Sequence, residues 1–153
     1  MARRPVALVA ALVLVVEAAG IAWLNWFLGL VVDNQKMSLA GLDPHAMTVG
    51  SWVAGGLMGL YLLLCGLVLL RTGVRDRAPG GVGRVLLISA AVLHAVLGAF
   101  SVGLVGWTAF AFLMVVLGLL VLTLVAYGKG AGADEEGSDG TQATAAVNGP
   151  NPA

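Results

Sequence analysis

Two ionisable side chains interrupt long apolar stretches of the sequence, where they would be placed to hold or transfer a proton. Glu17 lies in the first apolar run, and His94 lies in the run between Val85 and Tyr127. An ionisable group within a membrane span is costly and by default indicates a functional site. Loss of water favours the neutral form of a carboxyl there. The structural alternative is a protonated Glu17 that only hydrogen-bonds a neighbouring helix, and the sequence leaves both open.

Tyr61 brings a third polar group to a similar depth. Counted along the chain from the nearest arginines, Glu17, Tyr61 and His94 lie about 20, 15 and 15 Å from one membrane surface at 1.5 Å per residue. We hypothesise a cluster of these three side chains that either relays protons or satisfies buried polar groups. Asn25 joins this candidate set because it follows Glu17 at i+8 spacing, on the same side of a helix. Small residues flank His94 at helical spacing, namely Ala90, Ala91, Gly98 and Ser101. They permit close helix approach, so the ring should point into the bundle.

Neither a cofactor nor a metal ion is expected. His45 lies near a membrane surface, far in depth from His94, so only a symmetric dimer that pairs two His94 residues would supply opposed ligands to a haem. The spacing of Asp33, Asp43 and His45 matches no metal site. Cys65 is the only cysteine, which excludes an intrachain disulfide and predicts an inert buried thiol. No catalytic or nucleotide-binding motif is present, so an enzyme is not expected, and a redox subunit is the third alternative.

The elements that must position these side chains are transmembrane helices. Hydrophobic residues make up 59% of the 153 residues, charged residues make up 10%, and the mean hydropathy is +0.97. Soluble domains carry roughly 25% charged residues. Apolar runs long enough to cross a hydrocarbon layer of about 30 Å predict four spans, at residues 6–32, 44–70, 85–104 and 108–127. The expected fold class is therefore all-α, an integral membrane bundle over residues 1–127.

Local signals set the boundaries of these spans. Asp43 followed by Pro44 is typical of a helix N-cap and a first helical position. Residues 85–127 carry no formal charge apart from one titratable histidine, and as a single helix they would be about 65 Å long. Because this length is twice the bilayer, the chain must fold back, and Gly103 and Gly106 mark the expected hairpin tip.

The two ends of the chain carry separate signals. A cleaved signal peptide is the alternative for the first span, with Arg3 and Arg4 preceding the apolar run. The run continues to Val32, which favours a retained helix. Residues 128–153 are rich in small and polar residues and contain the acidic cluster Asp134, Glu135, Glu136 and Asp139. They have too few large apolar residues to offset the entropy of ordering, which predicts a disordered acidic tail.

Basic residues are distributed unevenly between the two sides of the membrane. The side that holds both termini and the second loop carries Arg3, Arg4, Arg71, Arg75, Arg77, Arg84 and Lys129. The other side carries Lys36 alone. Because basic loops stay in the cytoplasm, we expect both termini to be cytoplasmic and the protein to be a multi-pass protein of a bacterial inner membrane. An outer interfacial belt is expected from Trp23, Trp26, Trp52 and Trp107.

Small residues recur along one face of the second span, at Ser51, Gly55, Gly59 and Gly66. The Gly55-x-x-x-Gly59 spacing is a pattern at which membrane helices approach closely. It favours packing within the chain over a dimer seam, and a homo-oligomer stays an open alternative.

Three segments carry a resemblance to a known group: NWFLGLVVDNQKMSLAGLDP at Asn25–Pro44, LLRTGVRDRAPGGVGRVLL at Leu69–Leu87 and GWTAFAFLM at Gly106–Met114. They resemble small four-span integral membrane proteins of actinobacteria, a group with no assigned function. The resemblance covers nearly everything but the tail. It implies a membrane location and offers no catalytic residue to carry over.

The segment LVVEAAG, which contains Glu17, is also weakly similar to the first span of the small multidrug resistance exporters, where a mid-span Glu is essential. This chain is longer and lacks that family's other span motifs, and its uneven basic charge argues against the antiparallel dimers that some such exporters form. The expected function is a non-enzymatic structural or accessory membrane component. A small proton-coupled transporter using Glu17 is the alternative. Expected partners are the lipid bilayer and a second copy or another membrane protein, not nucleic acid.

Overall fold

The computed structural model describes residues 3–36, 41 and 43–147, with side chains described as far as residue 128. Over these ranges the chain forms four helices and no strand: α1 (Arg3–Gln35), α2 (Pro44–Arg75), α3 (Gly81–Leu104) and α4 (Trp107–Val147). All four are long and apolar enough to cross a membrane, and the apolar part of α4 is Trp107–Gly128. The prediction of an all-α bundle with four spans is confirmed.

The helix ends follow the local sequence signals. The Asp43 side chain caps α2 by accepting a hydrogen bond from the backbone N–H of His45 at 2.7 Å. Between α3 and α4 the chain turns at Val105 and Gly106, and Gly106 has a φ of +114°, which favours glycine. α3 begins at Gly81 rather than at the predicted Val85, because helical hydrogen bonds continue past the apolar run into less apolar residues.

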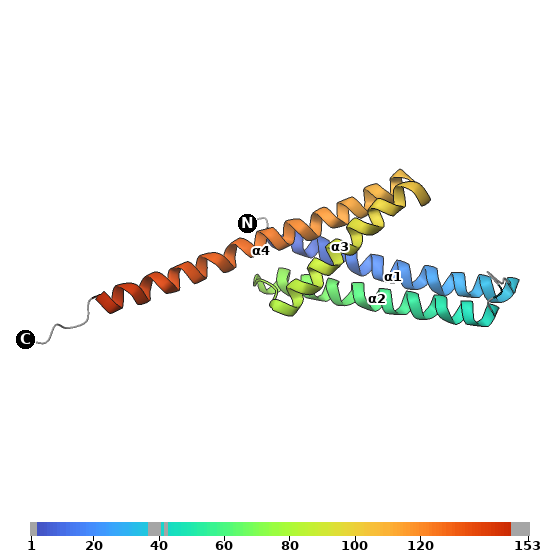
Figure 1. Ribbon diagram of the computed structural model, residues 1–153, viewed down its shortest axis with the longest axis horizontal. Helices are drawn as coiled ribbons and strands as arrows, with labels where there is room; N and C mark the ends of the chain where they lie inside the picture. The colour runs from blue at the N-terminus through green and yellow to red at the C-terminus, as the bar shows by residue number, and fades with distance from the viewer. Residues whose placement is uncertain (1–2, 37–40, 42, 148–153) are drawn as a thin grey trace, which may run out of the picture.

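The four helices form two hairpins that meet at one end (Figure 1). α1 and α2 lie side by side along their length, and α3 packs mainly on α4. From there the two hairpins diverge, so the turn between α3 and α4 lies apart from the end of α1 and the start of α2. The core lies where all four helices meet, and each helix contributes to its fully buried leucines, Leu14, Leu62, Leu69, Leu87 and Leu120.

Glycines of α2 allow the close approach of α1. A Cβ atom on Gly59 would lie 3.1 Å from a backbone carbonyl oxygen of α1, and Gly66 meets α1 at similarly short range. Gly55 lies directly against the side chain of Asn25. The hydroxyl of Ser51 donates a hydrogen bond to the Asn25 carbonyl at 3.0 Å. The small-residue face of α2 therefore packs against α1 within the chain.

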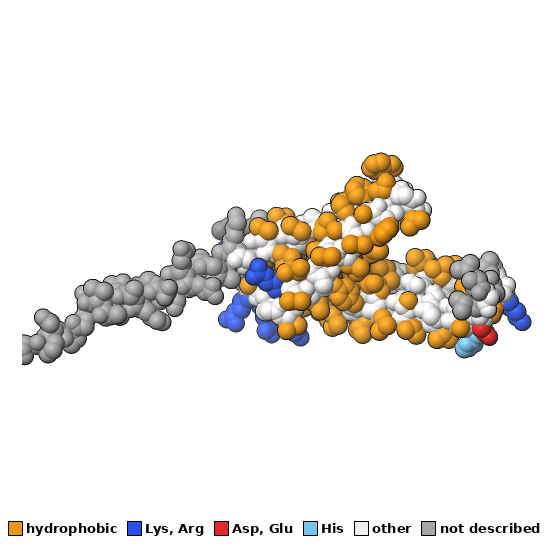
Figure 2. All heavy atoms as spheres, viewed as in Figure 1, with side chains coloured by type: hydrophobic (Ala, Val, Ile, Leu, Met, Phe, Trp, Pro, Cys, Tyr) orange, Lys and Arg blue, Asp and Glu red, His pale blue; other side chains and the backbone are white. Residues whose placement is uncertain are grey.

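The surface of the bundle is apolar apart from its two ends. Figure 2 shows hydrophobic side chains over most of the helices, and Lys and Arg side chains gathered near the α2–α3 connection. Leu12, Val16 and Leu57 are each more than 60% exposed. Monomeric soluble proteins rarely expose apolar patches of this extent, so this is the surface that lipid is expected to cover.

A single carboxylate links three helices at the arginine-rich end. Asp76 follows α2 in the left-handed conformation, with a φ of 51°. One of its carboxylate oxygens lies 3.3 Å from Nε of Arg4, and the other accepts a hydrogen bond from the Tyr127 hydroxyl at 3.2 Å. These contacts hold the start of α1, the α2–α3 connection and the end of the α4 span at the same end of the bundle.

Beyond Gly128 the backbone of α4 continues as helix to Val147, over most of the segment that the sequence predicts to be disordered. Proline, which lacks a backbone N–H and interrupts helical hydrogen bonds, is absent from this stretch of the sequence, because the first proline after the start of α4 is Pro150. The acidic residues of the tail fall among side chains outside the described residues.

Candidate functional site

Glu17 of α1 and His94 of α3 meet inside the bundle. Nε2 of His94 lies 3.1 Å from a carboxyl oxygen of Glu17. The His94 side chain is 1% exposed and the Glu17 side chain is 10% exposed. Ala90 and Gly98, one turn before and after His94, are buried with it, as its predicted inward orientation requires. The structure therefore joins the two ionisable residues that the sequence placed within separate spans.

The second ring nitrogen of His94 determines how protons are shared in this pair. Nδ1 lies 2.8 Å from the carbonyl oxygen of Ala90, one helical turn earlier. A carbonyl oxygen only accepts hydrogen bonds, so Nδ1 must carry a hydrogen. Nε2 is then the acceptor in a neutral ring, or a second donor in an imidazolium.

Either state of the ring leaves one proton in the bond between the two side chains. If His94 is neutral, Glu17 must be protonated and donate to Nε2; if His94 is an imidazolium, Nε2 donates to the Glu17 carboxylate. The pair has no net charge in both states. Removing the proton would place a carboxylate against a nitrogen lone pair, and adding one would leave a net charge in the interior, which is costly.

The pair bridges two helices whose backbones stay apart. Over the described residues no Cα atom of α1 lies within 8 Å of one in α3, whereas α1 lies in close contact with α2. Long side chains are therefore needed to span the gap between α1 and α3. The hydrogen bond between Glu17 and His94 is consequently a direct tie between the two hairpins.

Tyr61, the third residue of the hypothesised cluster, is bonded elsewhere. Its hydroxyl lies 2.7 Å from the hydroxyl of Ser89, which in turn donates to the carbonyl of Leu86 at 2.8 Å. These groups are more exposed than the pair, and they belong to the contact of α2 with α3. The predicted depth of Tyr61 is similar to that of Glu17 and His94, but the orientation of α2 directs its side chain toward Ser89 rather than toward the pair.

Asn25 also lies outside the pair. Its side-chain amide donates to the carbonyl of Ile21 at 2.9 Å, within its own helix. Its side chain fills the space beside Gly55, and its backbone carbonyl oxygen accepts a hydrogen bond from the Ser51 hydroxyl. Asn25 therefore belongs to the packing of α1 on α2 rather than to a proton path.

Sequence analysis did not single out three partners in these contacts: Ser89, Asp76 and the Ala90 carbonyl. Ser89 is one of few polar residues in the third span, and Asp76 is the only acidic residue among the arginines of the second loop. Both residues differ in polarity or charge from their neighbours in the sequence, and this difference could have identified them. The carbonyl carries no signal in the sequence, because every residue has one.

The described side chains contain no group of three His, Cys, Asp or Glu residues that could hold a metal ion. Cys65 is buried among apolar residues of the core. Comparison of the chain with protein-family models, with curated proteins and with solved structures gave no match. A function for this protein must therefore be inferred from the geometry of the site.

Proposed function

We propose that the protein is a non-enzymatic accessory component of a bacterial cell membrane, with both termini in the cytoplasm. The observation that carries this proposal is the closed pair of Glu17 and His94. Glu17 and His94 bond each other, and every side-chain nitrogen or oxygen atom that the described residues enclose completely has a hydrogen-bond partner. Such an arrangement satisfies costly polar groups internally.

The diverging hairpins support a role in assembly with other helices. Away from the arginine-rich end, apolar side chains such as Leu24, Phe27 and Phe100 are at least half exposed. The chain itself does not cover them there, because α3 and α4 turn away from α1 and α2 (Figure 1). In this proposal that surface is covered by lipid and by a helix of a second copy or of another membrane protein.

A proton-coupled transporter using Glu17 is the second candidate, and one observation favours it. Glu17 keeps 10% of its side chain exposed while sharing a proton with His94. A coupling group must exchange its proton with water. The two candidates therefore differ in whether the proton of the pair leaves within the physiological pH range.

Infrared spectroscopy of the reconstituted full-length protein separates these candidates. The difference between wild type and Glu17→Gln isolates the bands of the Glu17 carboxyl. For the accessory role we expect these bands to stay constant between about pH 5 and 9, because both gain and loss of a proton are penalised in the closed pair. Reversible titration of the bands in that range would contradict the accessory role and favour the transporter.

The orientation has its own test, with cysteine labelling in intact cells. Gln35→Cys and Ala78→Cys place exposed thiols at opposite ends of the bundle without changing its charge. Because seven of the eight basic residues lie on the side of Ala78, a membrane-impermeant maleimide should label Gln35→Cys in intact cells and Ala78→Cys only after permeabilisation. Wild type is the control, since Cys65 is fully buried. Labelling of Ala78→Cys in intact cells would contradict the proposed orientation.

A further inference from the structure

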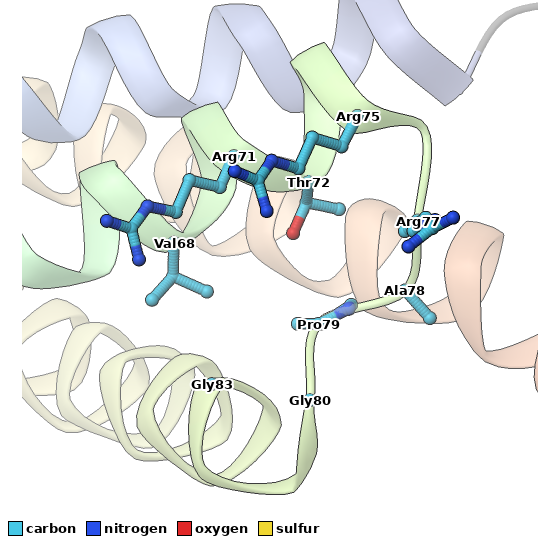
Figure 3. A pocket seen from close by; sticks show the side chains of 9 residues that line it. All are labelled: Val68, Arg71, Thr72, Arg75, Arg77, Ala78, Pro79, Gly80 and Gly83. Atoms are coloured by element: carbon cyan, nitrogen blue, oxygen red, sulfur yellow. The ribbon is translucent and has the colours of Figure 1, made fainter.

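A basic cavity opens at the end of the bundle where α2 passes into α3. We call it the arginine pocket; it has a volume of about 330 Å³. Arg71 and Arg75 line it from the last two turns of α2, and Arg77 lines it from the connection. Figure 3 shows Arg71 and Arg75 extending from the same side of α2, with Gly80 and Gly83 across the cavity. Three guanidinium groups therefore border one cavity at the level where the spans end.

These arginines have no carboxylate partner among the described side chains. The one ion pair of Arg with a carboxylate there joins Arg4 to Asp76, and Asp76 is engaged by Tyr127 as well. Among the described side chains, Arg71, Arg75 and Arg77 are therefore not engaged by a carboxylate. Guanidinium groups match the geometry of phosphate oxygens and bind them in pairs of hydrogen bonds.

Two further sets of donors border the same cavity. Thr72 is only 4% exposed, and its hydroxyl makes no hydrogen bond with the described residues. In Figure 3 this hydroxyl points into the cavity between Arg75 and Pro79. α3 starts at the far wall without a side-chain cap, and its Gly80 lines the cavity. The first N–H groups of a helix are unpaired and favour an anion.

An apolar groove continues from the arginine pocket toward the middle of the membrane. It is lined by Leu64, Leu67 and Leu86, and it shares Val68, Arg71 and Gly83 with the pocket. A ligand that fills both must carry an anionic group at the membrane surface and a hydrocarbon chain below it. Free phosphate satisfies the first condition alone, whereas an anionic phospholipid satisfies both.

We propose that the arginine pocket and its groove bind an anionic phospholipid, with the phosphate held by Arg71, Arg75 and Thr72 and an acyl chain lying between α2 and α3. Basic pockets between transmembrane helices recognise lipid head groups in this way. The site lies apart from the pair of Glu17 and His94, so it stands whichever function that pair serves.

Native mass spectrometry of the detergent-solubilised full-length protein tests the site. Phosphatidylglycerol and phosphatidylcholine with identical acyl chains are added at equal concentration, with and without excess inorganic phosphate. We expect the wild type to retain phosphatidylglycerol preferentially. Each basic contact contributes about fivefold in affinity, so Arg71→Gln and Arg75→Gln should each weaken this binding about fivefold, and the double variant by about 25-fold.

Arg84→Gln is the matched control, because Arg84 carries the same charge at the same end of the bundle and does not line the arginine pocket. It should change the affinity less than twofold. Equal retention of the two lipids, or equal losses in Arg84→Gln and Arg71→Gln, would overturn the proposal. Complete displacement of the lipid by inorganic phosphate at matched concentration would assign the site to free phosphate instead. Circular dichroism shows whether each variant is folded, and the single variants decide the matter if the double variant is not.

Discussion

Gly55→Leu is expected to disrupt the α1–α2 hairpin. A side chain at position 55 would overlap the Cβ and Cγ atoms of Asn25, which packs against Gly55. Overpacking of a close contact typically costs about 1–3 kcal/mol. Asn25 cannot move freely, because its side-chain amide and its backbone carbonyl oxygen are both hydrogen-bonded. The free energy of unfolding, measured by sodium dodecyl sulfate titration in mixed micelles, should fall by at least that amount.

Gly56→Leu is the control for this prediction. It introduces the same side chain one residue later, at a position where nothing lies within 4 Å of an added Cβ atom. The variant should unfold like the wild type, because its leucine enters the lipid or detergent. If both variants lose the same stability, the effect comes from a general property of leucine in α2, and the packing of Gly55 on α1 is not responsible.

His94→Ala and Glu17→Ala should each destabilise the protein by about 1–3 kcal/mol, the cost of leaving a buried polar partner without its hydrogen bond. The cost rises toward about 3–5 kcal/mol if the pair is ionised. Glu17→Gln should retain most of the stability, because the Gln side-chain amide donates to Nε2 in place of the protonated carboxyl. The measurement is again the free energy of unfolding in mixed micelles.

A double-mutant cycle isolates the bond itself. The combined variant Glu17→Ala with His94→Ala should lose less than the sum of the two single losses, because the second substitution removes a group that is already without its partner. Additive losses would mean that the two side chains do not interact, and the tie between α1 and α3 would be abandoned together with the closed pair on which the accessory role depends.

Local patterns were enough to predict the helices, because a membrane span depends on the composition of its own segment. The helix start at Pro44 is decided by the cap at Asp43, and the turn near Gly106 by a run too long to cross the bilayer once. The helical backbone beyond Gly128 was not predicted from composition, since low hydrophobicity says only that a segment lacks a core to pack on.

Local sequence patterns did not predict which side chains of the candidate site contact each other. Spacing along each helix placed Glu17, Tyr61 and His94 at similar depth, but depth leaves the rotation of each helix about its axis undetermined. Packing decides that rotation: the glycines of α2 pack against α1, and Gly98 of α3 packs against Met114 of α4. In this arrangement the His94 ring meets Glu17. The same packing directs Tyr61 to Ser89, and it brings the arginines of α2 to the start of α3. Residue types and spacing thus determined the spans and the groups able to carry protons, whereas contacts between distant segments decided which of those groups meet, because they depend on how whole helices pack.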